Sequence, residues 1–271
     1  MKKRKIVITG SGTGLGKEAA IKLAKRGHIV YATTYLESES DKLNIIAKKE
    51  NLELYSFKLD ILNKDDLNKL NTIQFDTLIN NAAISYSGSV AEIDIEEYKK
   101  VFETNVAANI NITQIAVKKF IKQKSGKIIF ISSLFGLVSI PFYSPYCLSK
   151  FAIECFSKSL RQELKLLKDL DINIQVKIIE PGAYKTGFNE KMAKIKYEWM
   201  KNHSYFKYKL DNIKKIEEKI WNFIQLKSFD SIIKKYIQAV ESTNNKFKYT
   251  APKLQSFFIK LYKTFETIFS F

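Results

Sequence analysis

The sequence predicts an α/β protein in which helices cover both faces of one doubly wound, parallel sheet. Short apolar runs alternate along the chain with stretches of helical periodicity, a pattern typical of parallel strands joined by right-handed crossovers. The chain has 271 residues, 45% of them hydrophobic, which is enough to bury one large core. A glycine-rich turn follows the first apolar run, where a strand would give way to a helix.

Six apolar runs have the length and composition of buried strands. We expect the sheet order 3-2-1-4-5-6, with residues 247–250 as a candidate seventh strand. We also expect residues 1–186 to form the core of the domain and residues 187–271 to cover it as part of the same domain. The six runs span 5–9, 28–33, 52–58, 75–80, 127–132 and 174–179.

The turn after the first run is suited to bind a diphosphate. Small apolar residues with helical spacing follow it at 19–24, so the turn joins a strand to a helix. Glycines let the backbone approach a pyrophosphate closely, and the helix start offers free amides and a positive dipole end. Leu15 stands where the more common dinucleotide fingerprint has glycine. The expected contacts are Gly10, Ser11, Gly12, Thr13, Gly14, Leu15 and Gly16.

A second pattern, Ser133 with Tyr146 and Lys150, indicates proton transfer. Ser144 is a good N-cap and Pro145 suits the first helical position, so Tyr146 and Lys150 should share one helix face. A free phenol titrates near ~10, and a neighbouring ammonium lowers its pKa toward the range useful for acid–base catalysis. Ser133 would hold a substrate oxygen by hydrogen bond. Alone, the Tyr and Lys pair would more often be a packed phenol beside a solvated amine.

Together these motifs resemble the short-chain dehydrogenase/reductase family, over most of the chain. The family's cofactor loop is similar to residues 9–16, and its Asn-Asn-Ala-Gly stretch to 80–83, where alanine replaces the final glycine. Its catalytic serine and Tyr-x-x-x-Lys resemble Ser133, Tyr146 and Lys150. The resemblance implies a Rossmann fold, a nicotinamide cofactor, hydride transfer to or from a small carbonyl or alcohol substrate, and a homodimer or homotetramer.

The resemblance also assigns further residues. Asn105 resembles the asparagine that completes the family's proton relay through water, and asparagine is otherwise unfavourable in mid-helix. Asp60, with Ile61, resembles the segment beside the adenine, although Asp60 could instead cap the next helix. Lys150 is expected to bind the nicotinamide ribose as well, and Asn81 could serve partly to satisfy backbone groups. The remaining expected cofactor contacts are Asn81, Ala82, Ala83, Tyr146, Pro181, Gly182 and Thr186.

The choice of cofactor depends on the end of the second strand. An acidic residue there would bind the ribose 2′-hydroxyl of NAD, whereas a basic residue suits the 2′-phosphate of NADP. Thr34 and Tyr35 are the candidate contacts here, and residues 32–35 contain no carboxylate. A threonine hydroxyl can donate to a phosphate, but the family's usual arginine is missing. We therefore expect NADP, with NAD as the alternative.

Segment 187–228 is expected to cover the substrate. An aromatic-lined lid suits an apolar carbonyl or alcohol of retinoid, steroid or long-chain type, although the same side chains could simply cover the sheet edge. A 3-oxoacyl-acyl-carrier-protein reductase is a second possibility, and a non-catalytic NADP-binding sensor is a third. The aromatic and methionine residues in question are Phe188, Met192, Tyr197, Trp199, Met200, Tyr205 and Phe206.

The net charge of +17 does not by itself identify a partner. Its basic residues are nearly all lysines, with three arginines, and guanidinium is preferred for phosphate and base recognition. We therefore expect a solvated surface rather than dedicated nucleic-acid binding. No apolar run approaches ~18 residues, and the first residues lead into a strand, so we expect a cytoplasmic protein. The two histidines are separated and lack partner ligands, so we expect no metal site.

The last segment, 254–271, is expected to form an amphipathic helix. Such a helix most often packs on its own domain, and we expect that here. A dimer contact or peripheral contact with a membrane surface is the alternative. The apolar positions are Leu254, Phe257, Phe258, Leu261, Phe265 and Ile268.

Overall fold

Seven parallel strands form one sheet in the computed structural model, which describes residues 2–269 and omits the side chains at 203 and 265–269. The strand order is β3-β2-β1-β4-β5-β6-β7. Both the predicted order and the seventh strand are therefore confirmed. The strands are β1 (Lys5–Ile8), β2 (Ile29–Thr34), β3 (Leu54–Lys58), β4 (Thr77–Asn80), β5 (Ser125–Ile131), β6 (Asn173–Pro181) and β7 (Lys248–Ala251).

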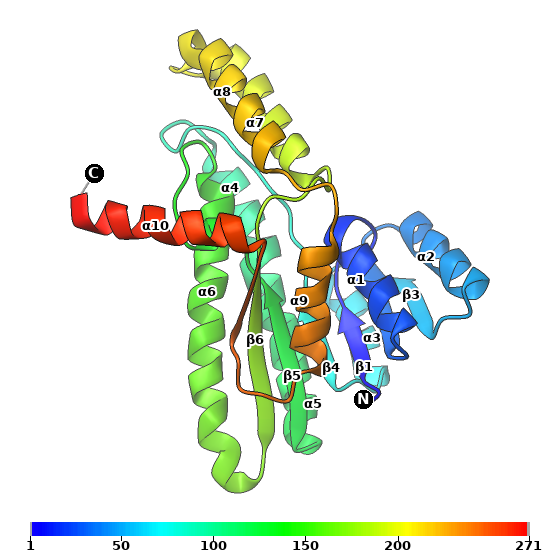
Figure 1. Ribbon diagram of the computed structural model, residues 1–271. Coiled ribbons are helices and arrows are strands. Elements are labelled where there is room, and N and C mark those ends of the chain that lie inside the picture. The colour runs from blue at the N-terminus through cyan, green and yellow to red at the C-terminus, as the bar shows by residue number, and fades with distance from the viewer. Residues whose placement is uncertain (1, 270–271) are drawn as a thin grey trace.

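Helices cover both faces of the sheet (Figure 1). On one face α1, α2 and α9 bury a common core, and on the other α3, α5 and α6 do the same. The main helices are α1 (Gly14–Lys25), α2 (Glu37–Lys49), α3 (Lys64–Thr72), α4 (Ile95–Phe102), α5 (Ala108–Lys122), α6 (Ser144–Lys165), α7 (Phe188–His203), α8 (Leu210–Ile224), α9 (Asp230–Glu241) and α10 (Lys253–Phe269).

The strands read as continuous apolar runs because both of their faces are buried. Ile129 and Ile131 of β5 join the core under α1 and α9, whereas Ile128 and Phe130 join the core under α5 and α6. Successive side chains of a strand point to opposite faces, so a strand between two helix layers needs apolar residues at every position. Because all seven strands are parallel, their carboxyl ends lie at one edge of the sheet.

The start of α6 differs from the sequence expectation. Tyr143 rather than Ser144 is the N-cap of α6, without a side-chain capping bond, and the Ser144 hydroxyl hydrogen-bonds with that of Tyr98 instead. A π-helical turn at Glu103–Ala107 separates α4 from α5. Such turns are common at functional sites, and this one contains Asn105.

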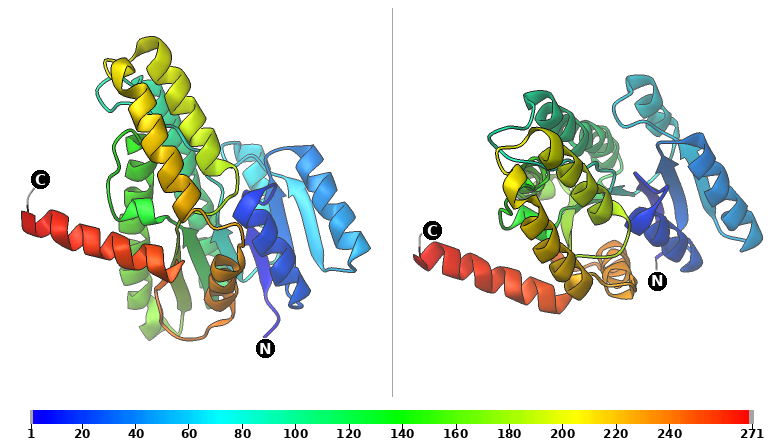
Figure 2. Two further views of the ribbon diagram at one scale, coloured as in Figure 1. Left: turned by 45° about the horizontal axis from the view of Figure 1, so that its top comes forward. Right: turned by 90° about the horizontal axis from the view of Figure 1, so that it is seen from above.

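The first two helices after residue 186 lie at the carboxyl edge of the sheet. Helices α7 and α8 stand above this edge as an antiparallel pair, and α10 extends away from the body of the molecule (Figures 1 and 2). Within residues 2–269, no helix combines the length and the apolar composition needed to cross a bilayer.

The packing predicts that Phe120→Ala will destabilise the fold strongly. Phe120 is fully buried, and its ring meets that of Phe75 edge-on at 5.5 Å between centroids. Truncation of a buried phenylalanine leaves a cavity and costs about 3–5 kcal/mol. Urea unfolding measures the change. The control is Phe223→Ala, because the Phe223 side chain is 90% exposed. Equal losses of unfolding free energy in the two variants would contradict the described core.

Candidate active site

A large cavity lies at the carboxyl edge of the sheet, with a volume of about 990 Å³. The glycine turn, the segments after β4, β5 and β6, and helices α6, α7, α8 and α10 contribute to its wall. All the predicted site residues line it except Ser11, Thr34 and Asn105. Those that do line it are Gly10, Gly12, Thr13, Gly14, Leu15, Gly16, Tyr35, Asp60, Ile61, Asn81, Ala82, Ala83, Ser133, Tyr146, Lys150, Pro181, Gly182 and Thr186.

The glycine turn forms one end of the cavity. Gly10 and Gly14 have φ values of +65° and +57°, in the left-handed region that favours glycine. A Cβ added to Gly10 would lie 2.6 Å from the Cα of Ala82. Ser11 does not line the cavity, because its hydroxyl donates to Ile8 O at 3.1 Å and its amide to a strand carbonyl. Ser11 therefore shapes the turn from behind.

Asn81 connects this turn to the rest of the site. Its side-chain amide donates to the carbonyls of Thr9 and Gly10, both at 2.9 Å. A Cβ added to Gly16 would lie 2.4 Å from that same nitrogen. The remaining amide oxygen accepts a 2.8 Å hydrogen bond from Tyr236, a fully buried residue of α9. Tyr236 thereby fixes the orientation of the amide. The sequence pattern did not indicate that Tyr236 belongs to the site.

Ser133, Tyr146 and Lys150 converge in the middle of the cavity wall. The Lys150 ammonium lies 5.5 Å from the centre of the Tyr146 ring and donates to the carbonyl of Ile131 at 2.9 Å. The Ser133 hydroxyl accepts the amide of Phe135 at 3.1 Å, and its influence on Tyr146 lowers the pKa of that phenol. The phenol, the amine and the hydroxyl can therefore act on one bound group.

Burial controls the ionisation of this group. It raises the pKa of Tyr146 above the ordinary value, and the hydrogen bond from Ser133 opposes the rise. It lowers the pKa of Lys150 to about 8. The pKa shift of the phenol is opposite in sign to the one expected from the sequence, because burial is its largest cause. At neutral pH Tyr146 is thus protonated, and Lys150 is mostly charged.

Asn105 lies behind the cavity rather than in its wall. Its side chain is fully buried and pairs with the backbone of Ile84 in both directions, at 2.8 and 2.9 Å. Its amide also donates to the hydroxyl of Ser149 at 3.0 Å, and Ser149 in turn donates to Tyr146 O at 2.8 Å. Asn105 therefore ties the π turn to the loop after β4 and to the start of α6.

The far end of the cavity contains a carboxylate that sequence reasoning missed. Thr34 was expected to contact the cofactor, but it is buried and does not line the cavity. Its hydroxyl donates to Leu36 O at 2.9 Å instead. Tyr35 lines the wall, together with Glu39 of α2. A Cβ added to Gly12 would lie 2.0 Å from Oε2 of Glu39. Glu39 follows the strand by five residues, whereas an acid that binds the ribose is expected at the strand end itself.

Aromatic side chains surround Tyr146 on the other side. Of the residues proposed for the lid, Phe188 lines the cavity, with its ring centre 5.4 Å from that of Tyr146. Met192 and Met200 are fully buried, and Tyr205 is exposed, so these three do not line it. Tyr197, Trp199 and Phe206 are also outside the wall, whereas Phe135, Tyr184, Trp221 and Phe258, which were not proposed, belong to it.

A buried ion pair holds α7 and α8 together over this side. Lys196 of α7 is fully buried and pairs with Glu217 of α8. Its ammonium also donates to the hydroxyl of Tyr143 at 3.0 Å, directly before the helix that carries Tyr146. Burial lowers the pKa of Lys196, and the carboxylate of Glu217 opposes the shift. The helical pair is therefore fastened to the residue that precedes the catalytic helix.

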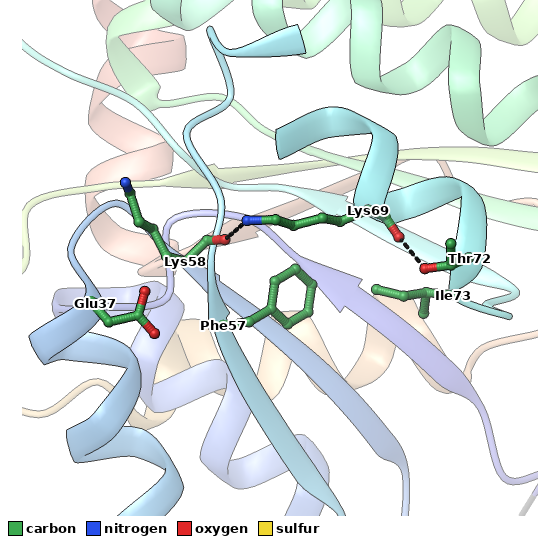
Figure 3. A pocket seen from close by; sticks show the side chains of 6 residues that line it. All are labelled: Glu37, Phe57, Lys58, Lys69, Thr72 and Ile73. Carbon is green, nitrogen blue, oxygen red and sulfur yellow. Dashed lines mark hydrogen bonds between the residues drawn. The ribbon is translucent and has the colours of Figure 1, made fainter. Parts of the chain in front are cut away.

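A second, smaller pocket of about 300 Å³ lies between α2, β3 and α3 (Figure 3). Lys69 donates to the carbonyl of Lys58 at 3.1 Å, and its charge is paired with the carboxylate of Asp66. The wall of this pocket contains none of the predicted site residues. It is formed by Glu37, Phe57, Lys58, Lys69, Thr72 and Ile73.

Comparisons with known proteins agree with this geometry. The family model for short chain dehydrogenases matches residues 4–196. The chain belongs to the short-chain dehydrogenase/reductase family. It is an NAD(P)-dependent oxidoreductase. Among relatives in this family, the uncharacterized oxidoreductase YusZ of Bacillus subtilis is 35% identical over 193 residues, which cover 69% of this chain and 67% of that protein.

Another family member, a 3-ketodihydrosphingosine reductase of Bacteroides thetaiotaomicron, is 31% identical over 194 residues, covering 68% of this chain and 65% of that protein. The matches cover 54% to 67% of the lengths of these curated relatives. A family structure from Burkholderia phymatum in complex with NAD has a TM-score of 0.80 at 17% identity, covering 98% of this chain and 95% of that one. One from Sphingobium yanoikuyae in complex with NADPH has a TM-score of 0.73 at 18% identity, with the same coverage.

The cavity fits the nicotinamide dinucleotide that the family uses. Its glycine turn leaves room where Cβ atoms would otherwise stand, and α1 begins at Gly14 without a side-chain cap on its amides. Ser133, Tyr146 and Lys150 line the same cavity. One elongated ligand can therefore reach both the turn and Tyr146.

The Asn81 contacts predict that Tyr236→Phe will weaken dinucleotide binding about three- to tenfold. Loss of the hydroxyl leaves the Asn81 amide oxygen without its donor. The amide is then less well oriented for its hydrogen bonds to the glycine turn. Fluorescence titration with NADH and NADPH measures the affinity. Tyr249→Phe is the control, because its buried hydroxyl bonds Ser242 instead. Equal affinities in wild type and Tyr236→Phe would contradict the positioning role.

Proposed function

We propose that this enzyme interconverts a carbonyl and an alcohol on an apolar small molecule, with Tyr146 as its proton-transfer residue. The observation that carries the proposal is the convergence of Ser133, Tyr146 and Lys150 in one cavity with the glycine turn. A bound nicotinamide supplies hydride exchange with the substrate carbon. The side chains of this chain then have to bind the substrate oxygen, move its proton and exclude water.

Each catalytic side chain has one task in this proposal. Tyr146, protonated at neutral pH because burial raises its pKa, donates to the carbonyl oxygen as charge develops there. Ser133 donates a second hydrogen bond to that oxygen. Lys150 stabilises the phenolate left behind and binds the nicotinamide ribose. Asn105 supports the relay from behind, since it fixes the start of α6 through Ser149.

The preference for NADP remains a prediction. The absence of a carboxylate at the end of β2 supports it, whereas the buried hydroxyl of Thr34 and the position of Glu39 against Gly12 weigh against it. A carboxylate beside the adenosine ribose would repel a 2′-phosphate and accept a hydrogen bond from a 2′-hydroxyl. The side chain of Glu39 therefore reduces the affinity for NADPH relative to NADH.

Aromatic residues beside Tyr146 support an apolar substrate. Phe135, Phe188 and Trp221 line the cavity there, and apolar walls with few polar groups favour ligands of the same character. The Bacteroides relative is named for the reduction of 3-ketodihydrosphingosine. We therefore propose a long-chain, steroid-like or retinoid-like carbonyl compound.

A 3-oxoacyl group on an acyl-carrier protein is the second candidate substrate, because the +17 charge of the chain would attract an acidic carrier. Turnover of carrier-bound but not free substrates would favour it. A non-catalytic sensor would have no use for the arrangement of Ser133, Tyr146 and Lys150, and the family assignment argues against it as well.

We predict that Tyr146→Phe lowers kcat/KM at least about a hundredfold, because acid–base catalysis by a positioned group contributes roughly that much or more. A panel of long-chain, steroid and retinoid carbonyls with NADPH and NADH provides the assay. Dinucleotide affinity should change less than about threefold, since the ring of Tyr146 is kept. Tyr249→Phe serves as the control. Turnover that survives in Tyr146→Phe would contradict the assignment.

We also predict that Glu39→Gln raises the affinity for NADPH relative to NADH by roughly three- to tenfold, as expected when one repulsive charge near a phosphate is removed. Fluorescence titration with each cofactor gives the ratio. Glu37→Gln, on the same helix but outside this cavity, is the matched control. An unchanged ratio in Glu39→Gln would show that the carboxylate does not face the ribose.

A further inference from the structure

The amphipathic helix α10 leaves its apolar face uncovered. Ser256 is buried and Gln255 is half-buried at the start of the helix, but the apolar stripe that follows is exposed. The expectation that this stripe packs on its own domain is therefore wrong for the described side chains; those of Phe265 and Ile268 lie outside them. The exposed positions are Leu254 (67%), Phe257 (60%), Phe258 (56%), Leu261 (42%) and Tyr262 (50%).

Helix α8 carries a second exposed apolar stripe. Ile216, Ile220 and Phe223 are 58%, 48% and 90% exposed. Their spacing of four and three residues places them on one face of the helix. Two other residues of α8 face inward, where Glu217 pairs with Lys196 and Trp221 lines the cavity. The apolar residues on this face are therefore not needed to pack α8 against α7.

The two stripes belong to helices that meet at the cavity. The side-chain amide of Gln255 donates to Ile224 O at 2.7 Å, and its oxygen accepts the amide of Ala183 at 2.7 Å. The first bond joins the start of α10 to the last turn of α8, and the second joins it to the segment after β6. Figure 2 shows α10 leading away from the base of α8 in both views. Ile224, Phe258 and Ile259 line the cavity, so the stripes continue its apolar wall outward.

The charge around these stripes identifies the kind of surface they fit. Residues 187–271 contain 17 lysines and eight acidic residues. On α10, Lys253 and Lys260 are exposed on the side away from the apolar stripe, and on α8, Lys215 and Lys219 flank it. A second copy of the chain would bring one lysine-rich surface against another. An anionic lipid surface instead attracts the lysines and accepts the apolar side chains.

We propose that the two exposed stripes dock the enzyme on an anionic lipid bilayer. They consist of Ile216, Ile220 and Phe223 of α8 and of Leu254, Phe257, Phe258, Leu261 and Tyr262 of α10. The aromatic side chains enter the headgroup region, and the lysines contact acidic headgroups. The cavity then opens beside the lipid, from which an apolar substrate can enter. Only this last step rests on the proposed function, because docking itself needs no turnover.

Sedimentation with vesicles tests the docking without any substrate. The full chain should bind vesicles of phosphatidylcholine and phosphatidylglycerol, bind phosphatidylcholine alone much more weakly, and dissociate as the salt concentration rises. The double variant Phe223→Ser/Phe257→Ser, which spares the cavity wall, should lower the vesicle partition coefficient at least about tenfold. The control variant Leu166→Ser/Tyr55→Ser, at exposed apolar positions on other elements, should bind as the wild type does.

Three results would overturn the proposal. The wild type could fail to bind the anionic vesicles, or the Phe223→Ser/Phe257→Ser variant could bind them as tightly as the control variant. The third result would come from light scattering without lipid. If the wild type formed a dimer or larger assembly and the Phe223→Ser/Phe257→Ser variant did not, the stripes would be a contact between two copies of the chain. Circular dichroism establishes that each variant is folded. Because no assay uses a carbonyl substrate, an error in the proposed function would leave these results unchanged.

Discussion

The close approach between the glycine turn and the segment after β4 is the contact on which the site depends. Asn81 donates to two carbonyls of the turn, and its nitrogen lies where a Cβ on Gly16 would stand. Any side chain at Gly10 or Gly16 would separate these backbones. Because they stay in contact, the phosphate-binding turn and the catalytic edge of the sheet form one cavity. Tyr236 secures the contact from α9.

Burial then determines how the catalytic group behaves. Tyr146 and Lys150 are removed from water by the same wall, so the phenol holds its proton more tightly and the ammonium more loosely than in solution. The π turn contributes from behind, since Asn105 joins the loop at Ile84 to Ser149 on the catalytic helix. Asn105 is thereby linked through Ser149 to the backbone of Tyr146.

Much of this arrangement could be predicted from local sequence signals. Apolar runs predicted six strands and a candidate seventh, and the doubly wound fold predicted their order. Short motifs pointed to Ser133, Tyr146 and Lys150, because each of these signals is confined to a few neighbouring residues. Contacts between distant segments had no such signal. Tyr236 bonds Asn81 across 155 positions and has the pattern of an ordinary core residue of an amphipathic helix. The exposure of α10 likewise depends on where the helix points, which periodicity does not encode.

The central claim is that the dinucleotide site at the glycine turn and Tyr146 share one cavity. A crystal structure of the chain with bound NADH or NADPH tests this claim most directly. We expect the diphosphate on the turn at 10–16 and the nicotinamide ring within contact distance of Tyr146. The ribose beside that ring should lie against Lys150. A dinucleotide bound elsewhere, or a Tyr146 side chain turned away from the nicotinamide, would contradict the account.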